Sequence, residues 1–266
     1  MVNKKIKLLP PIQPSIALIR QYRDALKPLI EAMAHSVEYW IKNPFEASAE
    51  LMEPDEEERG IQDASPAARM TARLSKIKRQ HQKVFNEVAK NLSKRIIEKT
   101  QGDVSLRLRN QLKDVMSVDV AVTRRVNNVM LASRAQSISY IKRIPQKYFS
   151  DVEREIMQAA TKGRDMAALT EKLKDTYNLT LNAAYFLAQD QVKKATEAIE
   201  RTAKQDIGLY TDIWRHSAIS AQPRLSHKHA DGKEYDNRKG CKIDGEYIFP
   251  KQLPGCNCYS QTKIEY

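Results

Sequence analysis

Histidine and cysteine side chains gather near the end of this 266-residue chain. Thiolate sulfur and imidazole nitrogen are the ligands that zinc prefers, and four of them close a structural tetrahedral site. The last two cysteines are separated by one residue, whereas a usual zinc knuckle leaves at least two. Two interpretations of the cluster stay open: a structural metal site, and a metal-free module in which the cysteines are small buried hydrophobic residues. The cluster contains His227, His229, Cys241, Cys256 and Cys258, and its candidate metal ligands are His227, Cys256 and Cys258.

The chain lacks the motifs of the common catalytic and nucleotide-binding sites. It has no GxxxxGK[ST] loop, no GxGxxG turn, no HExxH pair and no GxSxG elbow. Ser226, His227 and Asp231 lie close in sequence. Any chain of this length contains a serine, a histidine and an aspartate, so these residue types alone do not indicate a catalytic site. We therefore predict no catalytic residue, and no cofactor other than the zinc that the cluster could hold. On this basis the protein is expected not to be an enzyme.

A second group of candidate residues is basic. From Ser65 to Asn110 the chain has twelve Lys or Arg and three Asp or Glu. Such a segment could contact nucleic-acid phosphates by charge alone, with binding that depends on salt and ignores sequence. A solvated helix face is the alternative, and only Phe85 is available for base stacking. The candidate contact residues are Lys76, Lys78, Arg79, Lys83, Lys90, Lys94 and Arg95.

Composition limits the classes of protein that this chain can form. Its 45 Lys and Arg exceed its 33 Asp and Glu by 12, and 41% of its residues are hydrophobic, which is enough for a core. No apolar run approaches the ~18 residues of a membrane span, and the first residues lack the apolar core of a signal peptide. Three cysteines fit a reducing compartment better than a disulfide framework. We expect a basic protein that is made inside the cell and does not enter membranes.

Glycine placement divides the chain near Gly208. Three of the eight glycines precede residue 200, and five fall in the last sixty residues. Glycine costs about 1 kcal/mol in a helix interior and supplies turns with positive φ. The predicted fold class is therefore mainly α, with an elongated helical N-terminal and central region followed by a small α+β, turn-rich C-terminal module.

Three parts are expected along the chain. Residues 1–14 form an extended N-terminal arm because three prolines in it block a helix. Residues 15–207 form the helical region, with an acidic loop near 45–63. Residues 208–266 form the C-terminal module.

Interruptions are expected inside the helical region. Proline removes a backbone hydrogen bond and kinks or splits a helix. The first helix is expected to begin at Ser15, whose side chain can cap it. The expected breaks lie at Pro28, before a new helix from Asp103, at Pro145, and at Asn178, where the chain turns between helices at 166–177 and 181–205.

Tight turns are expected in the C-terminal module. Asp231-Gly232 predicts a hairpin and Asp244-Gly245 predicts a second turn, because both residue types tolerate positive φ. A module of this size buries too little surface to be stable alone. A metal ion, contact with the helices or a partner surface must therefore hold it.

A local brace is the expected solution. We predict that His227 lies close in space to Cys256 and Cys258, although about thirty residues separate them. Zinc is one brace. The metal-free alternative is a set of hydrogen bonds from His227 and Arg224 to backbone carbonyls near Cys256.

Several motifs follow one another from about residue 138 to the end of the chain. A helical stretch and an alanine-rich helix precede WRHS, PRLSH, GKEYDNRKG, YIFP and LPGCNCYS. In content and order this series resembles the phage Mu F-like family of minor head, or head morphogenesis, proteins. The matching residues are Trp214, Arg224, His227, Gly232, Tyr235, Asp236, Gly240, Pro254, Cys256 and Cys258.

The resemblance implies a minor structural protein of a tailed-phage head. Such a protein takes part in viral capsid assembly, associates with the portal protein and head subunits, and lies near packaged DNA. It is expected in the virion, inside the capsid near the portal vertex, and in the host cytoplasm during assembly. Two alternatives stay open: a hydrolase or nuclease acting through the His227 region, and a non-specific DNA-binding protein.

Overall fold

The computed structural model describes residues 5–42, 66–116, 120–161, 166–219 and 223–265. The acidic loop expected near 45–63 lies outside these residues. The predicted fold class is confirmed, because the described chain is mainly helical and ends in a small module of short strands and turns.

The chain forms two compact units. One unit contains Met1–Arg20, Ser93–Gln136 and Ala188–Tyr266, and the other contains Gln21–Leu92 and Ser137–Leu187. Several helices contribute residues to both units, so each unit is built from segments that are distant in sequence.

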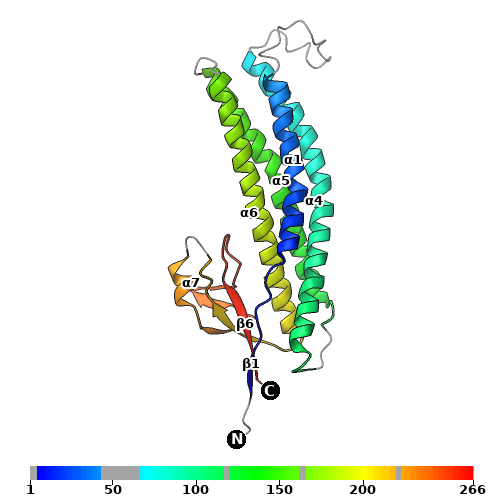
Figure 1. Ribbon diagram of the computed structural model, residues 1–266, viewed down its shortest axis with the longest axis vertical. Helices are drawn as coiled ribbons and strands as arrows, with labels where there is room; N and C mark the ends of the chain where they lie inside the picture. The colour runs from blue at the N-terminus through cyan, green and yellow to red at the C-terminus, as the bar shows by residue number, and fades with distance from the viewer. Residues whose placement is uncertain (1–4, 43–65, 117–119, 162–165, 220–222, 266) are drawn as a thin grey trace. The chain divides into compact units, whose positions relative to one another are not determined.

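Long helices account for most of the described residues (Figure 1). Side chains cap two of them, because the Leu18 amide donates to Ser15 Oγ and the Val126 amide to Thr123 Oγ1, at 3.4 and 3.1 Å. No helix in the described ranges has both the length and the apolar composition needed to cross a membrane. The long helices are α1 (Ile16–Val37), which continues as a π-helical turn η1 (Glu38–Lys42), α4 (Pro66–Leu112), α5 (Arg124–Thr161) and α6 (Met166–Asp206).

The helix ends expected before Asp103, at Pro145 and at Asn178 are wrong, and Pro28 does not split its helix. Pro28 lies inside α1 and Pro145 inside α5, and the chain passes through Asp103 in α4 and Asn178 in α6 without leaving the helix. A proline removes one backbone hydrogen bond. Burial next to it offsets that loss: the neighbours of Pro28 on the inner face of α1 are fully buried, as are the aromatic residues that follow Pro145.

The unit made of Gln21–Leu92 and Ser137–Leu187 is purely helical among its described residues. Its buried contacts include a hydrogen bond of 2.6 Å between Tyr22 Oη and Ser137 Oγ, which joins α1 to α5. Burial raises the pKa of Tyr22 to about 12. This unit supplies packing and holds none of the cysteines.

The other unit contains the sheet. Its four strands are antiparallel in the order β1-β6-β2-β3, with Leu8 of the N-terminal arm opposite Lys263. Alternate residues of β6 are buried, as expected for a strand with one face on a core. The strands are β1 (Ile6–Leu8), β2 (Thr211–Arg215), β3 (Glu234–Asp236) and β6 (Tyr259–Glu265), and β4 (Cys241–Ile243) pairs separately with β5 (Glu246–Ile248).

The two expected tight turns have different outcomes. Asp244 and Gly245 both have positive φ, 53° and 85°, and join β4 to β5 as predicted. Asp231-Gly232 also forms a tight turn, closed by the Lys233 amide on the Ala230 carbonyl at 3.0 Å. The hairpin expected there is wrong, because the preceding residues form a short helix, α7 (Leu225–His229), instead of a strand.

Candidate metal centre

Trp214 in β2 fixes the position of α7. Its side chain is fully buried, and its Nε1 donates a hydrogen bond of 3.1 Å to the carbonyl oxygen of His227. The two rings also meet edge to face, with centroids 5.2 Å apart. The tryptophan therefore holds both the backbone and the imidazole of His227.

His227 meets both cysteines of the closing motif. Its Nδ1 lies 3.5 Å from Cys256 Sγ and 3.7 Å from Cys258 Sγ. The ligand atoms of the three residues lie within 4.8 Å of one another, and all three side chains are buried. The predicted proximity of His227 to the two cysteines is confirmed.

A proline turn presents the cysteines. The Cys256 amide donates to the Leu253 carbonyl at 3.1 Å, and Gly255 inside this turn has a φ of 70°. This is a turn with proline second and a positive-φ glycine third, which is the pattern of a type II turn. The expected brace from Arg224 is also present, since its Nη2 donates to the Pro254 carbonyl at 3.2 Å.

The turn is also fastened to α6. Lys193 Nζ donates to Asn257 Oδ1 at 2.6 Å, and the Gly255 amide donates to Asp190 Oδ1 at 3.4 Å. The residue between the two cysteines is thus held from the helix, which leaves both sulfurs on the side of His227.

The two thiols shift each other's pKa in opposite directions. A hydrogen bond from the Cys258 thiol, supported by the backbone amides of Cys258 and Lys251, lowers the pKa of Cys256 to about 5. The same hydrogen bond, together with burial, raises the pKa of Cys258 above its usual range. The hydrogen bond between the two sulfurs therefore favours the thiolate form of Cys256 and the protonated form of Cys258.

His216 is a neighbour of this cluster that the sequence analysis did not include. Its Nδ1 lies 3.7 Å from Cys258 Sγ, and its backbone amide donates to Asp231 Oδ1 at 2.8 Å. Arg215 pairs with Tyr259 across β2 and β6, so continuing that register by one residue places His216 opposite Cys258. The pairing of these two strands was the missing information.

Two members of the sequence cluster lie outside this group. Cys241 is buried in the apolar core of the module, where burial raises the pKa of its thiol, so it behaves as a small hydrophobic residue. His229 is exposed and is the last residue of α7. Neither belongs to the set of close ligand atoms found in the described residues.

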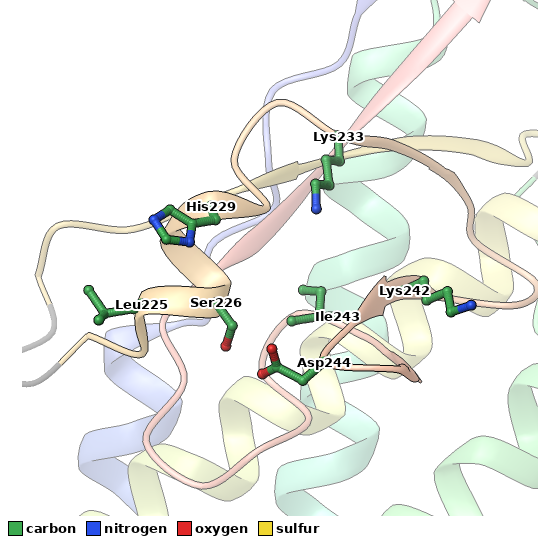
Figure 2. A pocket seen from close by; sticks show the side chains of 7 residues that line it. All are labelled: Leu225, Ser226, His229, Lys233, Lys242, Ile243 and Asp244. Atoms are coloured by element: carbon green, nitrogen blue, oxygen red, sulfur yellow. The ribbon is translucent and has the colours of Figure 1, made fainter.

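Ser226, His229 and Asp244 line an open hollow of about 550 Å³ (Figure 2). Among the described residues, no hydrogen bond joins His229 to Ser226 or Asp244. Asp231, the acidic member of the earlier Ser226-His227-Asp231 grouping, is used by the backbone of His216. The hydrogen-bonded chain of nucleophile, base and carboxylate that defines a catalytic triad is not formed by these residues.

The remaining motif residues shape the module. Tyr235 packs in its apolar core, and Gly232 has a φ of 81° in the turn after α7. Asp236 is held by the Arg238 guanidinium at 2.7 Å, and that hydrogen bond lowers the pKa of Asp236 to about 2. Gly240 has a φ of 98° and lies against the Ile248 backbone. These residues support the fold around the histidine and the cysteines.

A group of buried charged side chains connects α6 with the sheet. Lys204 forms an ion pair with Glu200, and both are almost fully buried. Burial raises the pKa of Glu197 to about 7, against the opposing effect of Arg201, whose Nη1 lies 3.4 Å from its carboxylate. Sequence reasoning missed this group because charged residues on a helix usually face solvent.

The candidate nucleic-acid contacts lie along α4. Lys76 and Lys78 are half-buried, and the other five side chains are exposed. At 100° per residue, five of the seven fall within about 60° of arc on this helix. Those five are Lys76, Arg79, Lys83, Lys90 and Lys94, and we call them the α4 basic face.

Comparison with curated proteins shows a similarity to a bacterial protein. The chain is 26% identical over 218 residues to an uncharacterized protein of Haemophilus influenzae (strain ATCC 51907 / DSM 11121 / KW20 / Rd). The match covers 81% of this chain and 47% of that protein, so the chain spans about half the length of this relative. No family model matches the chain. No solved structure matches it either.

Proposed function

We propose that this chain is a minor structural protein of a tailed-phage head that takes part in head morphogenesis and associates with the portal protein. The observation that carries the proposal is that the motif series resembling the phage Mu F-like family converges in space. Trp214 binds His227, Arg224 binds Pro254, and His227 meets Cys256. Residues that match the family in sequence order are thus also partners in one module.

The environment of His227 favours a structural role over catalysis. Its side chain is 3% exposed and is enclosed by Trp214 and the sulfurs of Cys256 and Cys258. A general base must reach the substrate proton that it removes, and a nucleophile must reach the substrate atom that it attacks. A histidine covered on these sides is better suited to hold the module together, which is what a rigid docking surface requires.

The proposed position near packaged DNA has a separate support. The α4 basic face offers cationic side chains in a row, which suits contact with phosphates without base recognition. We place the protein inside the capsid near the portal vertex, and in the host cytoplasm during assembly.

Co-purification tests the assembly role. The untagged full chain is expressed with an affinity-tagged portal protein from the same phage genome, and with a tagged protein unrelated to phage heads as the control. We expect the chain to be retained by the portal protein and to be found in purified phage heads by mass spectrometry. A chain that is missing from heads and is not retained by the portal protein contradicts the proposal.

Nucleic-acid turnover separates the assembly protein from the nuclease alternative. The purified full chain, the His227→Ala variant and the His229→Ala variant are incubated with DNA and RNA in the presence of divalent cations. We expect no turnover by any of them. Cleavage that is lost in His227→Ala and kept in His229→Ala would instead assign a hydrolytic function to the His227 region.

A further inference from the structure

Sulfur and nitrogen atoms in the C-terminal module stand at the distances found around a tetrahedral zinc ion. Zinc bonds of about 2.3 Å to sulfur and about 2.1 Å to nitrogen hold the two atoms about 3.6 Å apart. His227 Nδ1 lies 3.5 Å from Cys256 Sγ and 3.7 Å from Cys258 Sγ, and His216 Nδ1 lies 3.7 Å from Cys258 Sγ. The two separations from His227 match edges of one coordination tetrahedron around the set His227, Cys256 and Cys258. His216 reaches Cys258 at a matching distance but lies outside the set of ligand atoms within 4.8 Å of one another, so its half-exposed side chain must turn toward the other three to complete the site.

Hydrogen bonding alone satisfies this arrangement poorly. An imidazole nitrogen offers either one proton or one lone pair, yet Nδ1 of His227 faces two sulfurs, and Cys258 Sγ faces two imidazoles. A cation among His227, Cys256 and Cys258 serves each of these three atoms through one bond, and a turn of the His216 side chain would bring a fourth ligand to it. The convergence is therefore explained by a metal ion more completely than by pairwise contacts.

Charge and ligand type point to zinc. Two thiolates neutralise a divalent cation, so the metal and its ligands together carry no net charge. A neutral site suits this place because the surrounding side chains are buried. Thiolate and imidazole ligands suit zinc, whereas magnesium and calcium require oxygen ligands. The only half-exposed member is His216, which leaves the cluster reachable from the surface.

The ligands come from three separate pieces of the chain. His216 follows β2, His227 lies on α7, and the two cysteines precede β6. The apolar core of this module is small, with eight buried residues that include the two cysteines themselves. An ion bound by all three pieces would fasten the module, because metal-binding energy in such a site is folding energy.

We propose that His216, His227, Cys256 and Cys258 form a closed structural zinc site in which His216 is the completing ligand. The site needs no open position for a substrate, and its role is to lock β2, α7 and the closing turn into one surface. The proposal is independent of the head-protein function, since it rests on the geometry of the four side chains.

Metal content tests the site directly. The full chain is purified without a polyhistidine tag under reducing conditions and analysed for metals. We expect about one zinc per chain, and after exchange with cobalt a thiolate-to-metal charge-transfer band with the ligand-field bands of a tetrahedral centre. A reduced chain that holds no zinc and takes up no cobalt overturns the proposal, as does a stable disulfide between Cys256 and Cys258 in the freshly isolated protein.

Variants identify the ligands. Cys258→Ser is expected to abolish zinc binding. His216→Ala keeps both thiolates, so it should weaken zinc binding by at least about 100-fold, the upper end of the loss seen for residues that merely orient a ligand. It should also alter the ligand-field bands while the charge-transfer band persists. The matched controls His229→Ala and Cys241→Ser should retain about one zinc per chain.

The His216→Ala variant distinguishes a zinc site with four protein ligands from one with three. The side chain of His216 is half-exposed, so its loss should leave the fold intact even where Cys258→Ser does not fold. A His216→Ala variant with the zinc affinity and cobalt spectrum of the wild-type protein would overturn the four-ligand site.

Discussion

Glu197 is a carboxylate held inside the protein next to charges of both signs. It lies on α6 and is buried, with Arg201, Lys251, Glu200 and Asp212 around it. Burial is the largest influence and raises its pKa from 4.5 to about 7, whereas the two cations act in the opposite direction. The charged form of this side chain is therefore less stable in the folded protein than in the unfolded chain.

The pH dependence of stability should reveal this carboxylate. A pKa raised in the folded state stabilises the fold below pH 4.5, and this stabilisation is lost as the pH rises through about 7. We expect Glu197→Gln, which keeps an acceptor for Arg201, to be more stable than the wild-type protein at pH 8 by about 1–3 kcal/mol.

Denaturant unfolding between pH 4.5 and 8 measures the effect. Glu171→Gln, at an exposed position of the same helix, is the control and should follow the wild-type curve. A Glu197→Gln variant that loses stability most at high pH would show that the charged form is favoured in the fold.

At the scale of elements, two glycines have opposite roles. Gly240 precedes β4 with a φ of 98°, and a Cβ at this position would lie 3.0 Å from the Ile248 carbonyl oxygen. Gly102 lies inside α4, where an added Cβ meets nothing within 4 Å. The first glycine is required by its conformation and its close neighbour, and the second only weakens a helix.

Alanine substitutions should separate these roles. Gly240→Ala should lower the free energy of unfolding by about 1–3 kcal/mol because alanine must adopt a strained backbone there. Gly102→Ala should raise it by about 1 kcal/mol through better helix propensity. Thermal unfolding of the two variants gives the comparison. A stability loss in Gly102→Ala would show that the helix depends on a contact at that glycine.

At the scale of the whole molecule, the net charge of +12 is unevenly distributed along the sequence. The α4 basic face places exposed Arg79, Lys83 and Lys90 on one side of a helix whose buried residues, such as Phe85, lie on the other. Such a row favours DNA binding through counterion release, which weakens steeply as salt rises.

The salt dependence of DNA binding tests this face. We expect the double variant Lys83→Gln/Lys90→Gln to bind duplex DNA less tightly and to reduce the slope of log K against log salt by about 2. Lys228→Gln/Lys242→Gln removes the same charge from exposed positions in the C-terminal module and is the control. Fluorescence anisotropy over a salt series gives both slopes. Equal losses in the two variants would indicate attraction by net charge alone.

Local sequence signals predicted much of the fold. Apolar residues at helical spacing and the shift in glycine content indicated a mainly helical chain with a turn-rich end, because both act over a few neighbouring residues. Ser15 as a helix cap and Asp244-Gly245 as a turn followed in the same way. The helix does not split at Pro28 and does not end at Pro145, because packing of distant segments outweighed a local cost.

The sequence by itself determined which residue types could form a site, and it placed His227 near Cys256 and Cys258. Only the tertiary structure decided that His216 joins them, because its place follows from the register between β2 and β6. Tertiary structure also decided that Glu197 is buried and that His229 is not. Residue type and spacing act along the chain, whereas strand pairing and burial depend on segments that meet only after folding.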